Sequence, residues 1–288
     1  MNKPIIRWTI GHVIKSGYEI LDHSIKSIRK LYSNQFEYYV CYNDTDEKEI
    51  EKLKKIHKIN FIKQKWEDCP IDGIDLPEKV EEITKQKLNG SFWKICPPRL
   101  SKDTHEIILD NDLIFLKKPK IIEEFLSANN KNLIIKDSNI YLGSYKDLFI
   151  NEKQGYNSGF IGLHPGYDFE KDIVKNYKIN KNKKNLKYGE EQGLLMYSLY
   201  NTNPLIGSSE DFVGLHPDVV YFNCISNKFF EYAQDKINDK EKNKYIKLTT
   251  SLLKKILKEA EVVHFLGSNR KKHDAWNYYK NTLNKFLY

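Results

Sequence analysis

The first 115 residues alternate two kinds of segment, and this alternation restricts the fold more than any other feature of the sequence. Segments rich in β-branched and aromatic residues predict strands at 5–13, 36–44, 59–64 and 105–112. Between them, apolar residues recur at helical spacing, which predicts helices at 18–32, 46–56 and 78–100. Such alternation is typical of an α/β domain in which helices flank a largely parallel central sheet.

The second half of the chain is less regular. Its apolar segments predict strands at 132–136, at 158–164 and at a segment that ends near His264. Helical periodicity predicts helices at 189–200 and 249–260, and we expect the latter helix to pack on the core. There is no internal repeat and no linker rich in Pro, Gly or Ser, so we expect one compact unit.

The composition is that of a folded protein of a reducing compartment. Hydrophobic residues make up 40% and aromatic residues 13% of the 288 residues, which excludes an intrinsically disordered chain. No apolar stretch approaches the ~20 residues of a membrane helix, and the N-terminus does not resemble a signal peptide. The four cysteines have neither metal-binding spacing nor a dense disulfide pattern. We expect a cytoplasmic location, with peripheral membrane attachment as the open alternative.

The net charge of +8 leaves two interpretations open. A basic surface attracts nucleic acid, acidic lipid or nucleotide phosphates. The chain is also rich in Lys, Asn and Ile throughout, and its lysine-rich run at 178–187 has no aromatic residues that would stack on bases. Compositional bias therefore explains much of the charge, and nucleic acid is a weakly supported partner.

Two aspartates interrupt an apolar segment, "EIILDNDLIF", at 106–115. Burial of an ionised carboxylate is costly unless a positive charge compensates it, so Asp110 and Asp112 either face solvent at a strand end or hold a cation. If the strand continues through both residues, their side chains point to the same face. Two carboxylates on one face form a hard, anionic oxygen site that suits Mg²⁺ or Mn²⁺. Ligands of α/β sheets bind at the carboxyl ends of strands, where both aspartates are expected.

Three further stretches accompany this acidic segment. "YNSGFIGLHP" places 157–159 (Asn-Ser-Gly) at the start of an apolar strand, and "YGEEQGLLMYSLY" places 191–193 (Glu-Gln-Gly) at the start of a helix. "VVHFLGSNRKKHDAW" places His264 at the end of a strand, before Gly267 and the basic residues 270–272. An Arg-Leu pair also precedes the acidic strand in "PPRLSKDTHEIILDND". With these motifs in this order, most of the chain resembles the glycogenin-like glycosyltransferases of the GT-A fold.

The resemblance implies a single GT-A domain over 1–288, with a nucleotide-sugar-binding lobe at about 1–115 and an acceptor lobe with C-terminal helices at 116–288. It implies a metal-dependent glycosyltransferase whose donor is a nucleotide sugar, most simply a UDP-sugar, and whose product retains the anomeric configuration. The acceptor would be a glycan, a lipid-linked molecule or a protein.

The resemblance also implies roles for individual residues. Asp110, Asp112 and His264 would bind Mn²⁺ or Mg²⁺, which stabilises a diphosphate leaving group. Glu191 and Gln192 would act beside the reacting sugar carbon. A larger set from the strand ends, the segment before the acidic strand and the basic loop would contact the donor: Gly11, His12, Asn43, Asp44, Lys94, Arg99, Asn111, Asn157, Ser158, Gly159, Gly267, Arg270 and Lys271.

The basic loop departs from the family pattern. The family places a lysine six residues after the histidine, where this chain has Arg270, and Lys271 follows at once. An arginine can bind phosphate through two parallel hydrogen bonds, so either residue could serve.

Local structure offers a second explanation for several of these residues. Turn chemistry accounts for Asn43 and Asp44, and a turn at a strand start accounts for Gly159. A glutamate such as Glu191 is favoured in the first turn of a helix by the helix dipole. Lys94 and Arg99 would serve equally well at the surface.

Other functions also fit parts of the pattern. Haloacid-dehalogenase-like phosphatases use an Asp-X-Asp strand end, but that motif lies on the first strand of their fold, whereas here three predicted strands precede it. A non-catalytic protein that binds carbohydrate or nucleotide on the same fold is a further alternative. A glycosyltransferase that acts on modified DNA would use the positive net charge.

Overall fold

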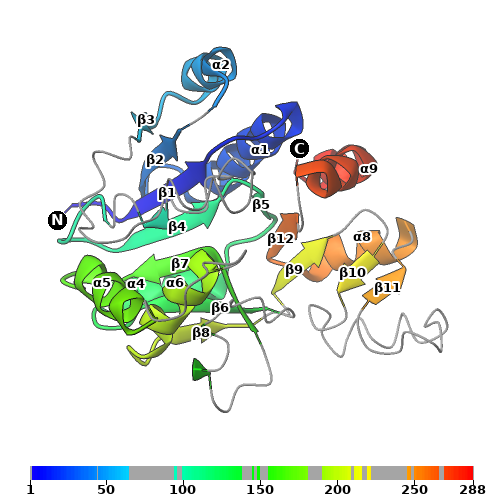
Figure 1. Ribbon diagram of the computed structural model, residues 1–288. Coiled ribbons are helices and arrows are strands. Elements are labelled where there is room, and N and C mark those ends of the chain that lie inside the picture. The colour runs from blue at the N-terminus through cyan, green and yellow to red at the C-terminus, as the bar shows by residue number, and fades with distance from the viewer. Residues whose placement is uncertain are drawn as a thin grey trace.

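A computed structural model describes the protein over residues 2–43, 45–64, 94–95, 99–137, 145, 148–149, 155–180, 190–208, 211–215, 219–221, 245–247, 250–265 and 269–287 (Figure 1). Within these ranges, the structure describes the backbone alone at residues 137, 180, 190, 219–221, 245–247, 250, 252, 269–272 and 286–287.

The strand–helix alternation predicted for the N-terminal region is confirmed. The elements follow in the expected order: β1 (Ile5–Ile10), α1 (Lys15–Tyr32), β2 (Glu37–Tyr42), α2 (Glu47–His57) and β3 (Asn60–Lys63). The predicted helix at 78–100 lies almost wholly outside the described residues.

Local sequence explains why α1 and α2 form. In α1, Leu21, Ile25 and Ile28 recur at helical spacing and are fully buried in the core. In α2, the side chain of Asp46 caps the first turn by accepting a hydrogen bond from the backbone N–H of Lys48. These two helices therefore pack one apolar face on the sheet and leave charged residues in solvent.

The central sheet has seven strands in the order β3-β2-β1-β4-β7-β6-β8. Its remaining members are β4 (Glu106–Asp110), β6 (Leu133–Asp137), β7 (Gly155–Leu163) and β8 (Leu205–Gly207). β3, β2, β1 and β4 pair in parallel, whereas β7 is antiparallel to both β4 and β6. The largely parallel sheet predicted from the sequence is confirmed. The parallel pairing also brings the carboxyl ends of β1, β2 and β4 to one edge, with Thr9 opposite Asp110.

A second, five-stranded sheet has the order β11-β10-β9-β12-β5. It consists of β5 (Leu113–Phe115), β9 (Phe212–Leu215), β10 (Val219–Tyr221), β11 (Tyr245–Lys247) and β12 (Val262–Phe265). Only β12 had been predicted. Both sheets combine strands from before and after residue 115.

The other helices cover the two sheets (Figure 1). They are α4 (Lys120–Ser127), α5 (Phe169–Asn180), α6 (Glu190–Tyr200), α8 (Thr250–Glu259) and α9 (Asn269–Leu287), of which α6 and α8 occupy predicted ranges. α5 and α6 pack on the face of the central sheet opposite α1 (Figure 1). α8 and α9 cover the second sheet. In the described part of the chain, no helix has the length and apolarity needed to cross a membrane.

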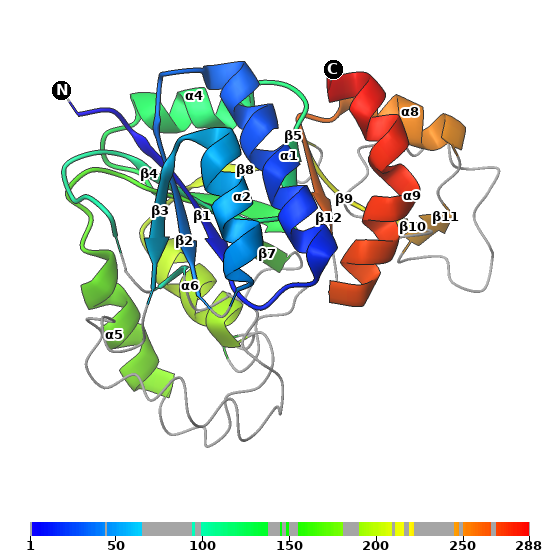
Figure 2. The same cartoon turned by 90° about the horizontal axis from the view of Figure 1, so that it is seen from above.

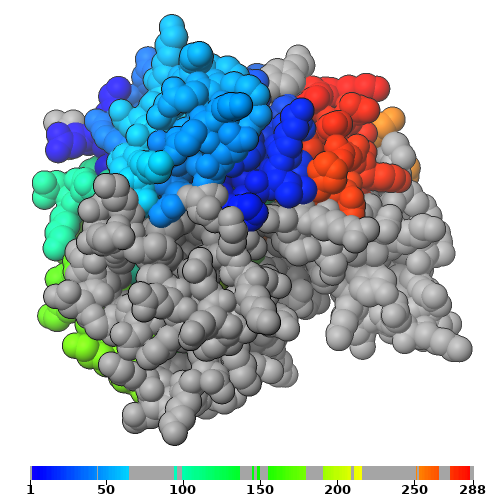
Figure 3. Space-filling model, turned by 45° about the horizontal axis from the view of Figure 1, so that its top comes forward, coloured from blue at the N-terminus to red at the C-terminus, as the bar shows by residue number. Residues whose placement is uncertain are grey.

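The two sheets are joined through α1 and α9, which lie side by side in the view from above and share one face of the molecule (Figures 2 and 3). The indole N–H of Trp276 donates a hydrogen bond of 3.0 Å to the carboxylate of Glu19. Trp276 is 1% exposed, so this contact lies within the packed interface between the helices. The C-terminal helix therefore fixes the second sheet beside the first.

Candidate metal and donor-binding site

The two aspartates of the acidic segment lie on either side of a chain crossing between the sheets. β4 ends at Asp110, a turn follows, and β5 begins at Leu113 in the second sheet. The single strand considered from the sequence does not continue through both residues, because the chain leaves the central sheet at Asn111. The side-chain amide of Asn111 donates to the carbonyl of Gly17 at 3.3 Å, which ties this turn to the start of α1.

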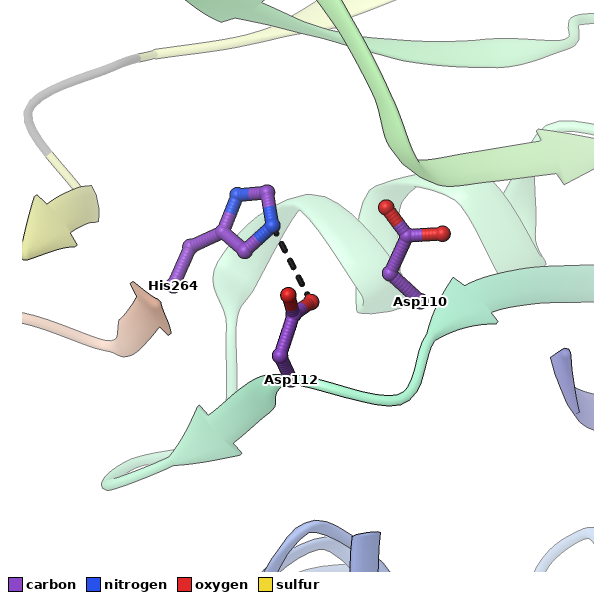
Figure 4. A group of neighbouring side chains, drawn as sticks. All are labelled: Asp110, Asp112 and His264. Atoms are coloured by element: carbon purple, nitrogen blue, oxygen red, sulfur yellow. Dashed lines mark ion pairs between the residues drawn. The ribbon is translucent and has the colours of Figure 1, made fainter. Parts of the chain in front are cut away.

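His264 reaches the site from the far end of the sequence. β12 pairs antiparallel with β5, with His264 opposite Leu113, and the N–H of Phe265 donates to the carbonyl of Asp112 at 3.1 Å. This pairing places the His264 ring beside the carboxylate of Asp112, with Nε2 3.2 Å from Oδ1 (Figure 4). The structure therefore brings the three predicted ligands together.

The three side chains form a compact group of hard donor atoms. One carboxylate oxygen from each aspartate and one ring nitrogen of His264 all lie within 4.8 Å of one another. Asp112 is fully buried, whereas the side chain of Asp110 is 24% exposed, so the group is open to solvent on one side. Two carboxylates this close repel each other unless positive charge lies between or beside them. The donor set of oxygen and imidazole nitrogen suits Mn²⁺ or Mg²⁺.

Gly159 leaves the space that a cation would need. It lies on β7 beside Asp110, and a Cβ at this position would approach Asp110 Oδ2 to 2.9 Å and His264 Cε1 to 3.0 Å. A side chain at this position would force Asp110 and His264 to shift, so glycine preserves the gap between these two ligands. The residues present therefore fit a divalent cation.

Asn157 holds the His264 ring from its other side. The backbone N–H of Gly159 donates to Oδ1 of Asn157 at 2.5 Å, which fixes the amide orientation. The amide nitrogen then lies 3.3 Å from Nδ1 of His264. This contact restrains rotation of the ring and directs Nε2 toward Asp112.

Lys94 and Gln192 join the same network. The Lys94 ammonium lies 2.7 Å from Asp110 Oδ1 and donates to Ser158 Oγ at 3.0 Å. The Ser158 hydroxyl donates in turn to Gln192 Oε1 at 3.4 Å. Gln192 lies in the first turn of α6, next to the half-buried Glu191. The side chain of predicted catalytic residue Gln192 is thus linked to Asp110 through two hydrogen-bonding groups.

The predicted nucleoside-binding residues lie at the same sheet edge. Gly11 is buried and His12 exposed directly after β1, and Asn43 follows β2 with its N–H bonded to the carbonyl of Ile10 at 3.2 Å. Because β1, β2 and β4 are parallel neighbours, these residues flank the acidic turn. Donor contacts at these residues stay a prediction.

Arg99 lies elsewhere. Its guanidinium donates to the carbonyls of Thr104, His164 and Tyr167 at 2.7–3.0 Å, and its Nε lies 3.9 Å from Glu106 at the opposite end of β4. Glu106 lies four residues before Asp110, so at ~3.3 Å per residue it is about 13 Å from the acidic turn. We therefore assign Arg99 a structural role in place of the predicted donor contact.

The other predicted donor residues belong to parts of the chain that the structure does not describe. Asp44 and Gly267 lie outside the described residues, as do the side chains of Arg270 and Lys271 at the start of α9.

Sequence reasoning missed Arg7 altogether. This arginine is fully buried on β1, pairs with Glu106 at 3.0 Å, and donates to the carbonyl of Lys94 at 3.3 Å. A single arginine inside the apolar strand "IIRWTI" is the signal that could have identified it, because a buried arginine requires a partner.

Comparisons with known proteins bear on the fold. No protein-family model and no curated protein sequence matches the chain. Solved structures match the chain. The galactosyltransferase LgtC, in complex with donor and acceptor sugar analogues, has a TM-score of 0.54 at 13% identity, and the alignment covers 99% of this chain and 95% of LgtC. The bifunctional glycosyltransferase WbbM has a TM-score of 0.54 at 13% identity, with 99% and 52% coverage.

The glycosyltransferase GlyE of Streptococcus pneumoniae TIGR4 has a TM-score of 0.51 at 11% identity, and the alignment covers 99% of this chain. The chain spans 63% of the length of GlyE and about half of WbbM, so these proteins contain further segments. The order of the strands, the crossing at the acidic turn and these likenesses lead to one conclusion. The chain has the GT-A fold, which it shares with these glycosyltransferases.

Proposed function

We propose that the protein is a metal-dependent glycosyltransferase that uses a nucleotide sugar, most simply a UDP-sugar, and retains the anomeric configuration. One observation carries the proposal. On a GT-A fold, Asp110, Asp112 and His264 converge within 4.8 Å at the carboxyl edge of the parallel strands, where α/β sheets bind their ligands.

The chemistry follows from the charges at this edge. Asp110, Asp112 and His264 would hold Mn²⁺ or Mg²⁺, which supplies positive charge to the diphosphate as the sugar–oxygen bond breaks. Gly159 keeps the gap between the ligands open. Arg270 or Lys271 would bind the phosphates from the start of α9. These residues would bind the leaving group more tightly as its negative charge grows.

The donor's nucleoside would bind beside β1 and β2. Gly11, His12 and Asn43 follow these strands and offer a buried backbone, an exposed ring and an amide. Small and polar groups of this kind accommodate a base and a ribose through hydrogen bonds.

Glu191 and Gln192 would act at the sugar. Both lie in the first turn of α6, and Gln192 contacts Ser158 next to the acidic group. In the structurally similar enzyme LgtC, a glutamine-to-glutamate variant is described as an active-site mutant, so that enzyme has a glutamine in its active site. A carboxylate beside the reacting carbon would accept the acceptor's proton or stabilise a positively charged transition state.

The alternatives differ in their support. The fold removes the basis for a phosphatase, because Asp110 ends β4 of a GT-A sheet. The acceptor is a glycan, a lipid-linked molecule or a protein, and modified DNA rests on the net charge alone. A non-catalytic binding protein would retain nucleotide affinity without turnover.

The test is a panel of nucleotide sugars assayed by nucleotide release, with and without EDTA. We expect release with one donor, its loss in EDTA, and its loss in Asp112→Asn, which removes charge with little change in volume. Asp274→Asn, an exposed position on α9, is the matched control and should behave as wild type. Full activity in EDTA or in Asp112→Asn would overturn the metal assignment. Nucleotide binding without release across the panel would favour the binding protein.

A further inference from the structure

We infer that Lys94 is a built-in counter-charge of the metal site, and that it makes cation binding depend on the donor diphosphate. The inference rests on the proposed function, because it takes Asp110, Asp112 and His264 as the ligands of a divalent cation. It assigns Lys94 a role toward the cation in addition to the donor contact predicted above.

Lys94 is a buried lysine with a charged partner inside the site. The residue is 3% exposed, and its Nζ lies 2.7 Å from Asp110 Oδ1 and 3.0 Å from Ser158 Oγ. Lysine is seldom buried this deeply unless it is paired. The other carboxylate oxygen, Asp110 Oδ2, faces the gap preserved by Gly159. One oxygen of Asp110 therefore contacts the Lys94 ammonium, and the other faces the proposed cation site.

The position of Lys94 is fixed from both ends. Its carbonyl accepts a hydrogen bond of 3.3 Å from Arg7, which is fully buried and paired with Glu106. Its ammonium is held by Asp110 and Ser158 on β4 and β7. A surface lysine that swings freely would have neither anchor. Lys94 therefore belongs to the built site.

The formal charges show what this lysine does. Asp110 and Asp112 bring two negative charges, and Lys94 cancels one of them, with His264 counted as neutral. A divalent cation bound by the protein alone would then leave surplus positive charge in a largely buried group. The diphosphate of a nucleotide supplies the missing negative charge. Cation and donor should therefore bind together, each raising the affinity for the other.

Replacement of Lys94 should weaken the dependence of cation binding on the donor diphosphate. Lys94→Met keeps the length of the apolar stem and removes the charge, so both aspartates would be available to Mn²⁺ alone. At the effective dielectric of a partly buried site, one charge a few ångströms away changes ion affinity by roughly tenfold or more. We expect Lys94→Met to bind Mn²⁺ without nucleotide about tenfold more tightly than wild type, and to gain less UDP affinity from Mn²⁺.

The experiment measures free Mn²⁺ by electron paramagnetic resonance in nucleotide-free titrations, and UDP affinity by calorimetry in Mn²⁺ and in EDTA. Lys94→Arg retains the charge and should keep Mn²⁺ affinity near wild type. Lys117→Met, at an exposed lysine bonded to the carbonyl of Glu259, is the surface control and should match wild type in both titrations. Lys94→Gln, a smaller neutral side chain, repeats the test if the methionine variant does not fold.

The outcomes separate the inference from the proposed function. If wild-type protein binds UDP more tightly in Mn²⁺, but neither neutral variant binds Mn²⁺ alone more tightly, the Lys94 inference is overturned and the metal site stands. If Mn²⁺ does not change the UDP affinity of wild type, both are overturned. Tighter Mn²⁺ binding in the neutral variants, with weaker coupling to UDP, supports the inference.

Discussion

Gly159→Ala tests whether the gap between Asp110 and His264 is the cation site. The new methyl carbon would lie 2.7 Å from Asn157 Oδ1, 2.9 Å from Asp110 Oδ2 and 3.0 Å from His264 Cε1. Unstrained contacts are ~3.5 Å, so these groups would have to move by about 0.5–0.8 Å. Metal–ligand distances tolerate only about 0.2 Å. The substitution should therefore remove cation binding while leaving every ligand in the sequence.

The same strand supplies a matched control. A Cβ at Gly162, also on β7, would come within 2.7–2.9 Å of Phe125 and Leu133 in the core, away from the acidic turn. Overpacking of this kind costs ~1–3 kcal/mol of stability. Both alanine variants should therefore lose comparable stability in urea unfolding, because both add one methyl group where there is no room.

Only the metal readout should separate the two variants. We expect Gly159→Ala to lose tenfold or more of its Mn²⁺-dependent UDP affinity by calorimetry, and Gly162→Ala to keep near wild-type affinity. If Gly159→Ala binds UDP and Mn²⁺ as wild type does, the gap is not where the cation binds. Equal losses in both variants would mean that general destabilisation, rather than the geometry of the site, explains the effect.

Three further predictions concern charge. Replacement of both Arg270 and Lys271 by Ala should weaken UDP binding roughly tenfold, since a charge-assisted phosphate contact is worth ~1.5–3 kcal/mol; unchanged affinity in calorimetry would exclude them from the site. Glu191→Gln should slow transfer steeply while UDP–Mn²⁺ affinity persists, and retained turnover would refute its catalytic role. Burial opposes ionisation of Asp22, but hydrogen bonds from His57 and a neighbouring lysine outweigh it and hold the pKa of the carboxyl below its usual value. Wild type should therefore exceed Asp22→Asn in stability above about pH 5 and lose that advantage as the pH falls below about 4; urea unfolding at several pH values that shows a constant difference would contradict this.

The sequence predicted those parts of the fold that depend on local signals. From β1 to β3, the strands are rich in β-branched and aromatic residues and the helices have apolar residues at helical spacing, and each element appears where these signals placed it. Four strands of the second sheet carried no such signal, because β5, β9, β10 and β11 have only three or four residues each. β5 is specified by β12, almost 150 residues away, and no local pattern records that pairing.

For the candidate site too, the sequence predicted some features and not others. The acidic segment pointed to Asp110 and Asp112, and the family resemblance added His264 as a third ligand; the structure brings the three side chains together. The contacts around them were not readable. Lys94 contacts a carboxylate because of packing between segments far apart in the chain. The same kind of packing directs the Arg99 guanidinium to three backbone carbonyls.

The place of β12 in the second sheet has a consequence for biosynthesis. β12 lies between β5 and β9. Among the described strands of that sheet, β5 pairs with β12 alone, so this pairing waits for residues 262–265. Chains emerge from the ribosome at ~5–20 residues per second, which leaves roughly 8–30 s between synthesis of β5 and of β12. During that interval Asp112 is present but His264 is not. A nascent or C-terminally truncated chain therefore cannot assemble the three-ligand site, and ribosome-stalled chains that end before β12 should bind Mn²⁺ only weakly.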